Sequence, residues 1–76
     1  MHLVIAKVDQ VFFDGEADSL TVQGSEGELT VLPHHEPLIT TLKAGAAVVR
    51  HGGQEQKFEI SGGLLEVHQN GVTVIL

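Results

Sequence analysis

Residues 24–42 read GSEGELTVLPHHEPLITTL. The stretch opens with an acidic turn between glycines, at positions 24–27, and contains a corner between prolines, at positions 33–37. The segments on either side of this corner, residues 28–32 and 38–42, are rich in the branched residues that strands favour. Proline cannot donate to a strand ladder, so one strand ends before the corner and another begins after it. The stretch therefore predicts two strands joined by a rigid corner and preceded by a glycine-bounded turn.

The rest of the chain shows a similar alternation of apolar and polar residues, which is typical of half-buried strands. Further strands are expected at His2–Val8, Val11–Phe13, Leu20–Gln23, Ala46–Arg50, Lys57–Ile60, Leu65–Val67 and Val72–Leu76. Turn signals lie between them at Asp14–Gly15, Ala44–Gly45, His51–Gln54, Ser61–Gly63 and Asn70–Gly71. No segment repeats apolar residues with the period of a helix. The chain is therefore predicted to be all-β, as a sandwich or a barrel, with no substantial helix.

Length and charge limit what the chain can do. Seventy-six residues make one small domain, which buries only about 60% of the surface of its unfolded chain and leaves little room for a deep pocket. The formal net charge is −6, with ten acidic and four basic residues, and such a surface repels phosphate backbones. The only aromatic residues are three phenylalanines, which offer no obvious platform for stacked bases. These features argue against nucleic acid as a partner.

The chain has no cysteine, which excludes a disulfide framework, a thiolate nucleophile and a cysteine-ligated zinc. It shows neither the basic and apolar start of a secretory signal nor the roughly 18 apolar residues that a spanning helix needs. We therefore expect a domain that does not insert into a bilayer but could dock on a membrane complex.

The His-His-Glu cluster at residues 34–36 could form a metal site, because imidazole and carboxylate groups are common zinc ligands. Adjacent strand residues point to opposite faces, however, so the two histidines do not easily reach one ion. A site would need a further histidine, from among His2, His51 and His68. The alternative is that the prolines fix the corner and the histidines are surface or interface residues.

Two other motifs lack the context that catalysis or nucleotide binding requires. The spaced glycines of residues 24–28 enclose two glutamates, and neither a Lys-Ser/Thr pair nor a helix follows, so no phosphate loop is expected. Ser61 precedes two glycines but lacks the G-x-S-x-G elbow of a serine nucleophile. The sequence thus predicts no catalytic residue and no cofactor. A partner that covers an exposed strand edge would suit such a domain.

Several motifs, in order along the chain, carry a resemblance to a known family. They are G-S-E-G-E-L at 24–29, L-P-x-H-x-P-L-I-T at 32–40, L-K-x-G at 42–45, I-S-G-G-x-L-E-V at 60–67 and V-T-V at 72–74. With them, the chain closely resembles the N-terminal domain of the epsilon subunit of F-type ATP synthase, called delta in mitochondria. The resemblance implies that residues 1–76 form one flattened sandwich of two antiparallel sheets, with about ten short strands.

The resemblance also implies a function. The chain would be a non-catalytic rotor subunit of the central stalk that joins the gamma subunit to the membrane ring of c subunits. In this position it would couple ion translocation to ATP synthesis. It would belong to a peripheral membrane complex at the cytoplasmic face of a bacterial membrane, without a cofactor or a metal.

Two sets of contact residues follow from the resemblance. The segment facing the c ring is Ser25, Glu26, Gly27 and Glu28. The positions towards gamma are His35, Thr40 and Lys7. Glu28 is the first choice for the ring contact, because a carboxylate there suits an arginine on a ring loop.

The sequence departs from the family pattern at three places. His34 stands where a glycine is usual, and Ala44 replaces a common proline before Gly45. Family members commonly continue into a C-terminal helical hairpin that restrains ATP hydrolysis, whereas this sequence ends at Leu76. We therefore expect coupling without inhibition by such a hairpin.

Two other functions remain open. One is a small cupin-like metal-binding protein that uses His34, His35 and Glu36. The other is a β-sandwich adaptor of an unrelated complex. Metal titration tests the first, and a pull-down with the gamma subunit tests the second.

Overall fold

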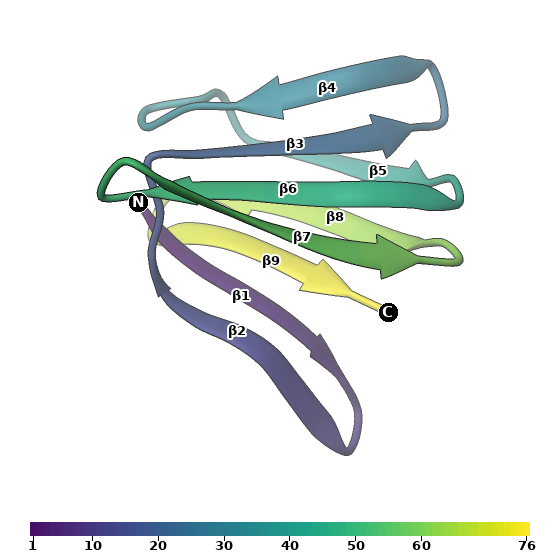
Figure 1. Ribbon diagram of the computed structural model, residues 1–76. Helices are drawn as coiled ribbons and strands as arrows, with labels where there is room; N and C mark the ends of the chain where they lie inside the picture. Colours follow the sequence, from purple (N-terminus) through teal and green to yellow (C-terminus); the bar gives the residue numbers. More distant parts are fainter.

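A computed structural model describes residues 1–76 and contains nine strands and no helix (Figure 1). The strands are β1 (His2–Lys7), β2 (Gln10–Glu16), β3 (Ser19–Gly24), β4 (Gly27–Val31), β5 (Leu38–Leu42), β6 (Gly45–His51), β7 (Gln54–Ile60), β8 (Gly63–His68) and β9 (Gly71–Ile75). The chain thus has no helical segment with the length and hydrophobicity that crossing a bilayer requires. The Cα atoms span 26 × 25 × 21 Å along the principal axes, a slightly flattened shape.

The strands form one curled sheet that folds over into two layers (Figure 1). The strand order is β2-β1-β9-β8-β5-β3-β6-β7, and β4 pairs with the other side of β3. Only one residue pair, Gly24 with Leu42, joins β3 to β5. One layer is therefore β2-β1-β9-β8-β5, and the other is β4-β3-β6-β7. The predicted all-β fold is confirmed, with nine strands rather than about ten.

One strand pair departs from the predicted antiparallel pairing. Strands β1 and β9 run parallel, with Leu3–Ala6 alongside Val72–Ile75. Gly71 begins β9 with a φ of 149°, and a Cβ atom at this position would collide with the backbone of His2. A glycine is therefore needed where β9 comes in beside β1.

The two layers enclose one apolar core. Its buried residues are Leu3, Ile5, Ala17, Leu20, Val22, Val31, Leu42, Ala47, Val49, Ile60, Leu65, Val67, Val72 and Val74. Most of them occur two positions apart on one strand, which is the spacing of side chains that share a face of a sheet. The predicted alternation of half-buried strands is confirmed by Leu20 with Val22, by Leu65 with Val67 and by Val72 with Val74, whose side chains are all buried.

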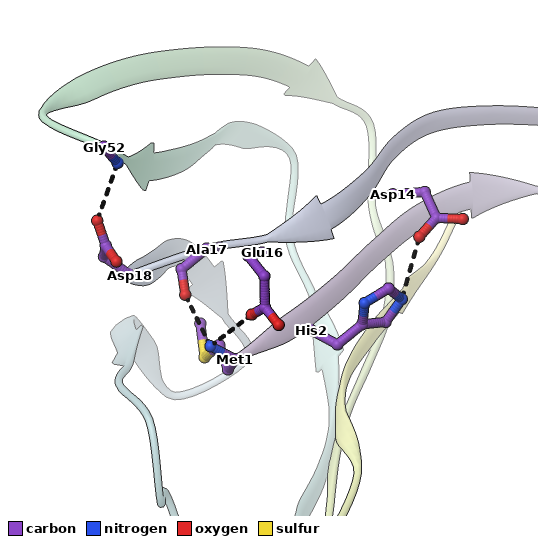
Figure 2. Close-up of polar contacts among 7 residues, drawn as sticks. All are labelled: Met1, His2, Asp14, Glu16, Ala17, Asp18 and Gly52. Carbon is purple, nitrogen blue, oxygen red and sulfur yellow. Dashed lines mark hydrogen bonds and ion pairs between the residues drawn. The ribbon is translucent and has the colours of Figure 1, made fainter.

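The predicted turn at Asp14–Gly15 is wrong. Strand β2 continues through both residues, and the turn that joins β1 to β2 lies at Val8–Asp9. Gly15 is paired with Leu3 in the ladder. The Asp14 carboxylate lies 3.0 Å from Nε2 of His2 across the same two strands (Figure 2). This cross-strand pairing outweighs the local turn preference of the Asp-Gly pair.

The two predicted hairpins of the second half are confirmed. The turn at His51–Gln54 has its two glycines in the left-handed region, with φ of 56° and 78°. In the β8–β9 hairpin the turn residues are 69–70, because Gly71 already pairs with His68. Both turns bring adjacent strands together within one layer.

The chain crosses from one layer to the other at Ala17 and Asp18, and hydrogen bonds hold this crossing on both sides. Figure 2 shows two of them, from the Met1 amino group to the Ala17 carbonyl and between Asp18 and Gly52. The Ala17 amide donates to the Met1 carbonyl at 2.8 Å, and the Asp18 amide donates to the Arg50 carbonyl at 2.7 Å. The Asp18 carboxylate accepts a hydrogen bond from the Gly52 amide at 3.1 Å. The crossing is thereby tied to β1, to β6 and to the β6–β7 turn.

Replacing Leu65 by alanine tests the core. Leu65 is fully buried, so Leu65→Ala should lower the free energy of unfolding by about 2–5 kcal/mol, measured by urea denaturation. The matched control is Leu32→Ala, because Leu32 is 55% exposed and its loss should cost less than about 0.5 kcal/mol. Equal losses in the two variants would show that Leu65 does not belong to the core.

Candidate functional site

The acidic hairpin, residues 24–28, joins β3 to β4. Gly24 pairs with Gly27, so the turn itself consists of Ser25 and Glu26. Gly27 has a φ of 125°, a backbone conformation that side-chain-bearing residues rarely adopt. The predicted c-ring residues Ser25, Glu26, Gly27 and Glu28 are all exposed. The structure therefore brings these four residues together on one projecting turn.

The acidic hairpin is held against β5 by Ser25. Its amide donates to the Thr41 carbonyl at 3.0 Å, and its hydroxyl lies 3.3 Å from the Thr40 hydroxyl. On the other side, Nε2 of Gln23 donates to the Glu28 carboxylate at 3.5 Å, a long hydrogen bond. The exposed turn is thus anchored by its base, which favours a defined position for the carboxylates.

A small notch lies beside the acidic hairpin. Its volume is about 190 Å³, and its lining residues are Gly24, Glu26, Gly27, Glu28, Leu29, Leu38 and Thr40. Two leucines provide an apolar wall and two carboxylates provide negative charge. An arginine or lysine side chain combines an apolar stem with a cationic head, so the notch is suited to such a side chain.

The proline-bounded corner lies at the opposite end of β4 from the acidic hairpin (Figure 1). It contributes to a larger hollow. This hollow has a volume of about 600 Å³ and is lined by Met1, His2, Leu32, Pro33, His34, His35, Pro37, Val67, His68, Gln69, Asn70, Gly71 and Val72. His34 adopts a left-handed conformation with a φ of 68°. The next amide, that of His35, donates to the Leu32 carbonyl at 3.1 Å and closes a tight turn.

Two of the three histidines named as possible additions to the corner, His2 and His68, do line the hollow, and His51 does not. The ring of His51 instead lies 5.5 Å from that of Phe13, in a tilted arrangement. No group of three or more His, Asp or Glu side chains is placed so that it could hold a metal ion. The metal-binding function that was left open thus lacks a donor set in this geometry.

The residues predicted to face gamma do not gather at one place. Lys7 ends β1, and its ammonium group lies 5.9 Å from the centre of the Phe12 ring. His35 lines the hollow, whereas Thr40 lines the notch and contacts Ser25. Thr40 therefore adjoins the residues predicted to face the c ring.

Sequence reasoning missed a row of apolar side chains on the outer face of the β2-β1-β9-β8-β5 layer. Val11, Ala6, Ile75 and Leu64 are consecutive partners across β2, β1, β9 and β8. Val11 is 60% exposed and Ile75 is 48% exposed, and Val8 is fully exposed at the adjoining turn. In the sequence these residues belong to unbroken apolar runs. The alternation of side chains along a strand does not say, however, which of its two faces a partner covers.

A sequence model of the family described as ATP synthase, Delta/Epsilon chain, beta-sandwich domain matches residues 1–76. The chain belongs to this family. The resemblance that the motifs of the sequence carried is therefore confirmed, and the acidic hairpin and the hollow are features of a delta/epsilon domain.

Two solved structures contain chains that are similar to this one. A chain in a structure of the Euglena gracilis mitochondrial ATP synthase, OSCP/F1/c-ring in rotational state 1, is similar with a TM-score of 0.91 and 29% identity. The match covers 99% of this chain and 49% of that one. A chain of the Tetrahymena thermophila mitochondrial ATP synthase central stalk and c ring shares the fold, with a TM-score of 0.78 at 14% identity, over 99% and 63% of the two chains. The present chain thus spans about half of the first relative and under two thirds of the second.

The conformation of His34 gives a test of the corner. A residue with a side chain in the left-handed conformation destabilises the folded state by roughly 1–2 kcal/mol. Glycine removes this strain, but the greater flexibility of glycine in the unfolded chain offsets part of the gain. His34→Gly should therefore raise the free energy of unfolding by about 0.5–1 kcal/mol in urea denaturation.

His35→Gly is the matched control for this test. His35 does not have a positive φ, so glycine at that position should lower the free energy of unfolding. A loss of stability in His34→Gly as large as that in His35→Gly would contradict the left-handed assignment.

Proposed function

We propose that the chain is a non-catalytic component of the central stalk of a rotary ATP synthase. In this role it joins the gamma subunit to the ring of c subunits and helps to couple ion translocation to ATP synthesis. The observation that carries the proposal is the match of the delta/epsilon family to all of residues 1–76. The similarity to a chain from an assembly of F1 and the c ring supports it.

The positions of the titratable side chains suit binding to a partner protein better than catalysis. The exposed acids of the hairpin lie on a projecting turn, beside a notch that fits a cationic side chain. No three His, Asp or Glu side chains form a group that could hold a metal. We therefore assign the chemical step of ATP synthesis to other subunits.

We propose that the acidic hairpin faces the c ring. Glu28 and Glu26 flank the notch, and Leu29 forms part of its wall. An arginine from a ring loop would place its stem against the leucine and its guanidinium beside the carboxylates. Thr40 would lie at the border of this contact through its hydroxyl contact with Ser25.

We propose that gamma is bound through Lys7 and His35, with the apolar row from Val11 to Leu64 as an additional surface near Lys7. Lys7 pairs with Gln10 in the ladder, one position from Val11, so the charged and apolar groups adjoin. An apolar centre with a polar rim is the usual anatomy of a protein interface.

We further propose a peripheral position in a membrane complex, at the cytoplasmic face of a bacterial membrane. The solved structures described above are both mitochondrial, so an organelle membrane is the alternative. Fractionation of the source cells, followed by salt extraction of the membranes, separates these cases.

Charge reversal at Glu28 tests the ring contact. Glu28→Lys should weaken binding to the purified c ring at least about tenfold, because like charges would meet across the contact. The melting temperature should change little, since Glu28 is exposed. The matched control is Glu59→Lys, on the exposed side of β7, which should leave binding unchanged.

Equal weakening by both substitutions would indicate a general charge effect and would contradict a specific role for Glu28. A parallel fall in melting temperature and binding for Glu28→Lys would place Glu28 in a structural role instead. The wider proposal is tested by a pull-down with the gamma subunit. Failure to capture gamma would favour the unrelated adaptor.

A further inference from the structure

The hollow at the proline-bounded corner gathers four of the five histidines of the chain. They are His2, His34, His35 and His68. They come from the start of β1, from the corner and from the end of β8, so the topology and not a local motif brings them together. The parallel pairing of β1 with β9 places His2 beside the β8–β9 turn.

No carboxylate lines the hollow, although the chain contains ten acidic residues. The acids on the surrounding elements are Asp14 and Glu16 on β2, Glu36 in the corner and Glu66 on β8. Asp14 pairs with His2 at 3.0 Å, and Glu16 lies 3.1 Å from the Met1 amino nitrogen. The hollow is therefore a concave, acid-free region on an otherwise acidic protein.

The ring nitrogens of the histidines include several that have no partner within the chain. Nδ1 of His35 lies 2.8 Å from the Glu36 carbonyl, which can only accept, so Nδ1 carries the proton and Nε2 has the free lone pair. Nε2 of His68 contacts the Thr73 hydroxyl at 3.2 Å, which leaves its Nδ1. A protonated imidazole donates from both nitrogens, so protonation turns these free positions into donors.

We propose that this hollow binds a phosphate group through protonated histidines. A phosphate oxygen accepts charge-assisted hydrogen bonds, and a volume of about 600 Å³ holds such a group with part of a larger molecule. No lysine or arginine lines the hollow, and the amino group of Met1, which also lines it, is paired with Glu16 at 3.1 Å, so the unpaired positive charge comes from the histidines. An imidazolium ring binds an anion more strongly than a neutral ring does, so binding should strengthen as the pH falls.

The ligand has two possible sources, free phosphate and the phosphate monoester headgroup of a lipid, and both present the same chemistry. The inference does not involve the acidic hairpin, but it shares His35 with the proposed contact with gamma. Phosphate binding by the isolated chain and capture of gamma are measured separately, so failure of one is distinguished from failure of the other. A metal ion would be the other usual ligand of histidines, but no three donors are placed to share one.

The first arm of the test uses inorganic phosphate. Titration of the chain with phosphate at pH 6 and at pH 8, followed by NMR of the histidine rings, should give saturable shifts for His34 and His68. The apparent affinity should be several-fold tighter at pH 6 than at pH 8, because protonated rings donate charge-assisted hydrogen bonds to the phosphate. His51 lies outside the hollow and serves as an internal control whose signals should not move.

Substitutions of single histidines test whether phosphate binds in the hollow. Because His34 is exposed and His68 half-buried, His34→Gln and His68→Gln should retain the fold, and each should weaken phosphate binding several-fold. His51→Gln should leave it unchanged. Melting curves of all three variants separate lost binding from lost folding.

The second arm uses vesicles of phosphatidylcholine with and without phosphatidic acid, at the same two pH values. Co-sedimentation that needs phosphatidic acid, acid pH and both His34 and His68 would identify the lipid headgroup as a source. Saturable binding of free phosphate without vesicle binding would identify the soluble source. The proposal is overturned if neither probe binds, if binding is equal at pH 6 and pH 8, or if His51→Gln weakens it as much as His68→Gln.

Discussion

The two layers of this domain depend on one narrow junction between β3 and β5. The residue pair Gly24 and Leu42 is flanked by two backbone hydrogen bonds, from Lys43 to Gln23 at 2.8 Å and from Ser25 to Thr41 at 3.0 Å. A longer ladder at this point would hold the strands in one open sheet. Because the ladder is so short, the sheet folds over and the inner faces of its two halves meet in a single core.

The same junction fixes the acidic hairpin. Ser25 takes part in the junction through its amide and also reaches the Thr40 hydroxyl, so the exposed acids begin one residue beyond the point where the layers join. Gly24 is buried, and a Cβ atom there would lie 3.1 Å from the Gly27 carbonyl oxygen. Fold and candidate contact surface thus share the same glycines, which explains why a solvent-facing turn carries such a constrained sequence.

What the sequence could predict was local. Period-two alternation gave the strands and the inward phase of side chains such as Leu65, because neighbouring residues alone determine that pattern. The Asp14–Gly15 turn failed because a cross-strand partner, not a local preference, decides whether such a pair stays extended. Motifs spread along the whole chain carried the family resemblance, which the family match confirms.

Features that depend on pairing between distant strands could not be predicted from the sequence. No pattern within β1 or β9 says that the two run side by side in parallel, and the meeting of His2 with the corner depends on that arrangement. The apolar row of Val11, Ala6, Ile75 and Leu64 could not be predicted for the same reason, since its members come from four strands. The contact roles of individual residues depend further on partner chains, and they remain proposals.

The direction of the strands has a mechanical consequence. Strand β4 runs from the turn of the acidic hairpin, Ser25 and Glu26, towards the corner, and its five residues, paired along their whole length with β3, span about 17 Å. A pull directed along this strand strains all of its ladder hydrogen bonds together in shear, whereas a pull across it would open them one after another. The acidic hairpin and the corner are therefore connected along the direction in which the β3–β4 ladder best resists separation.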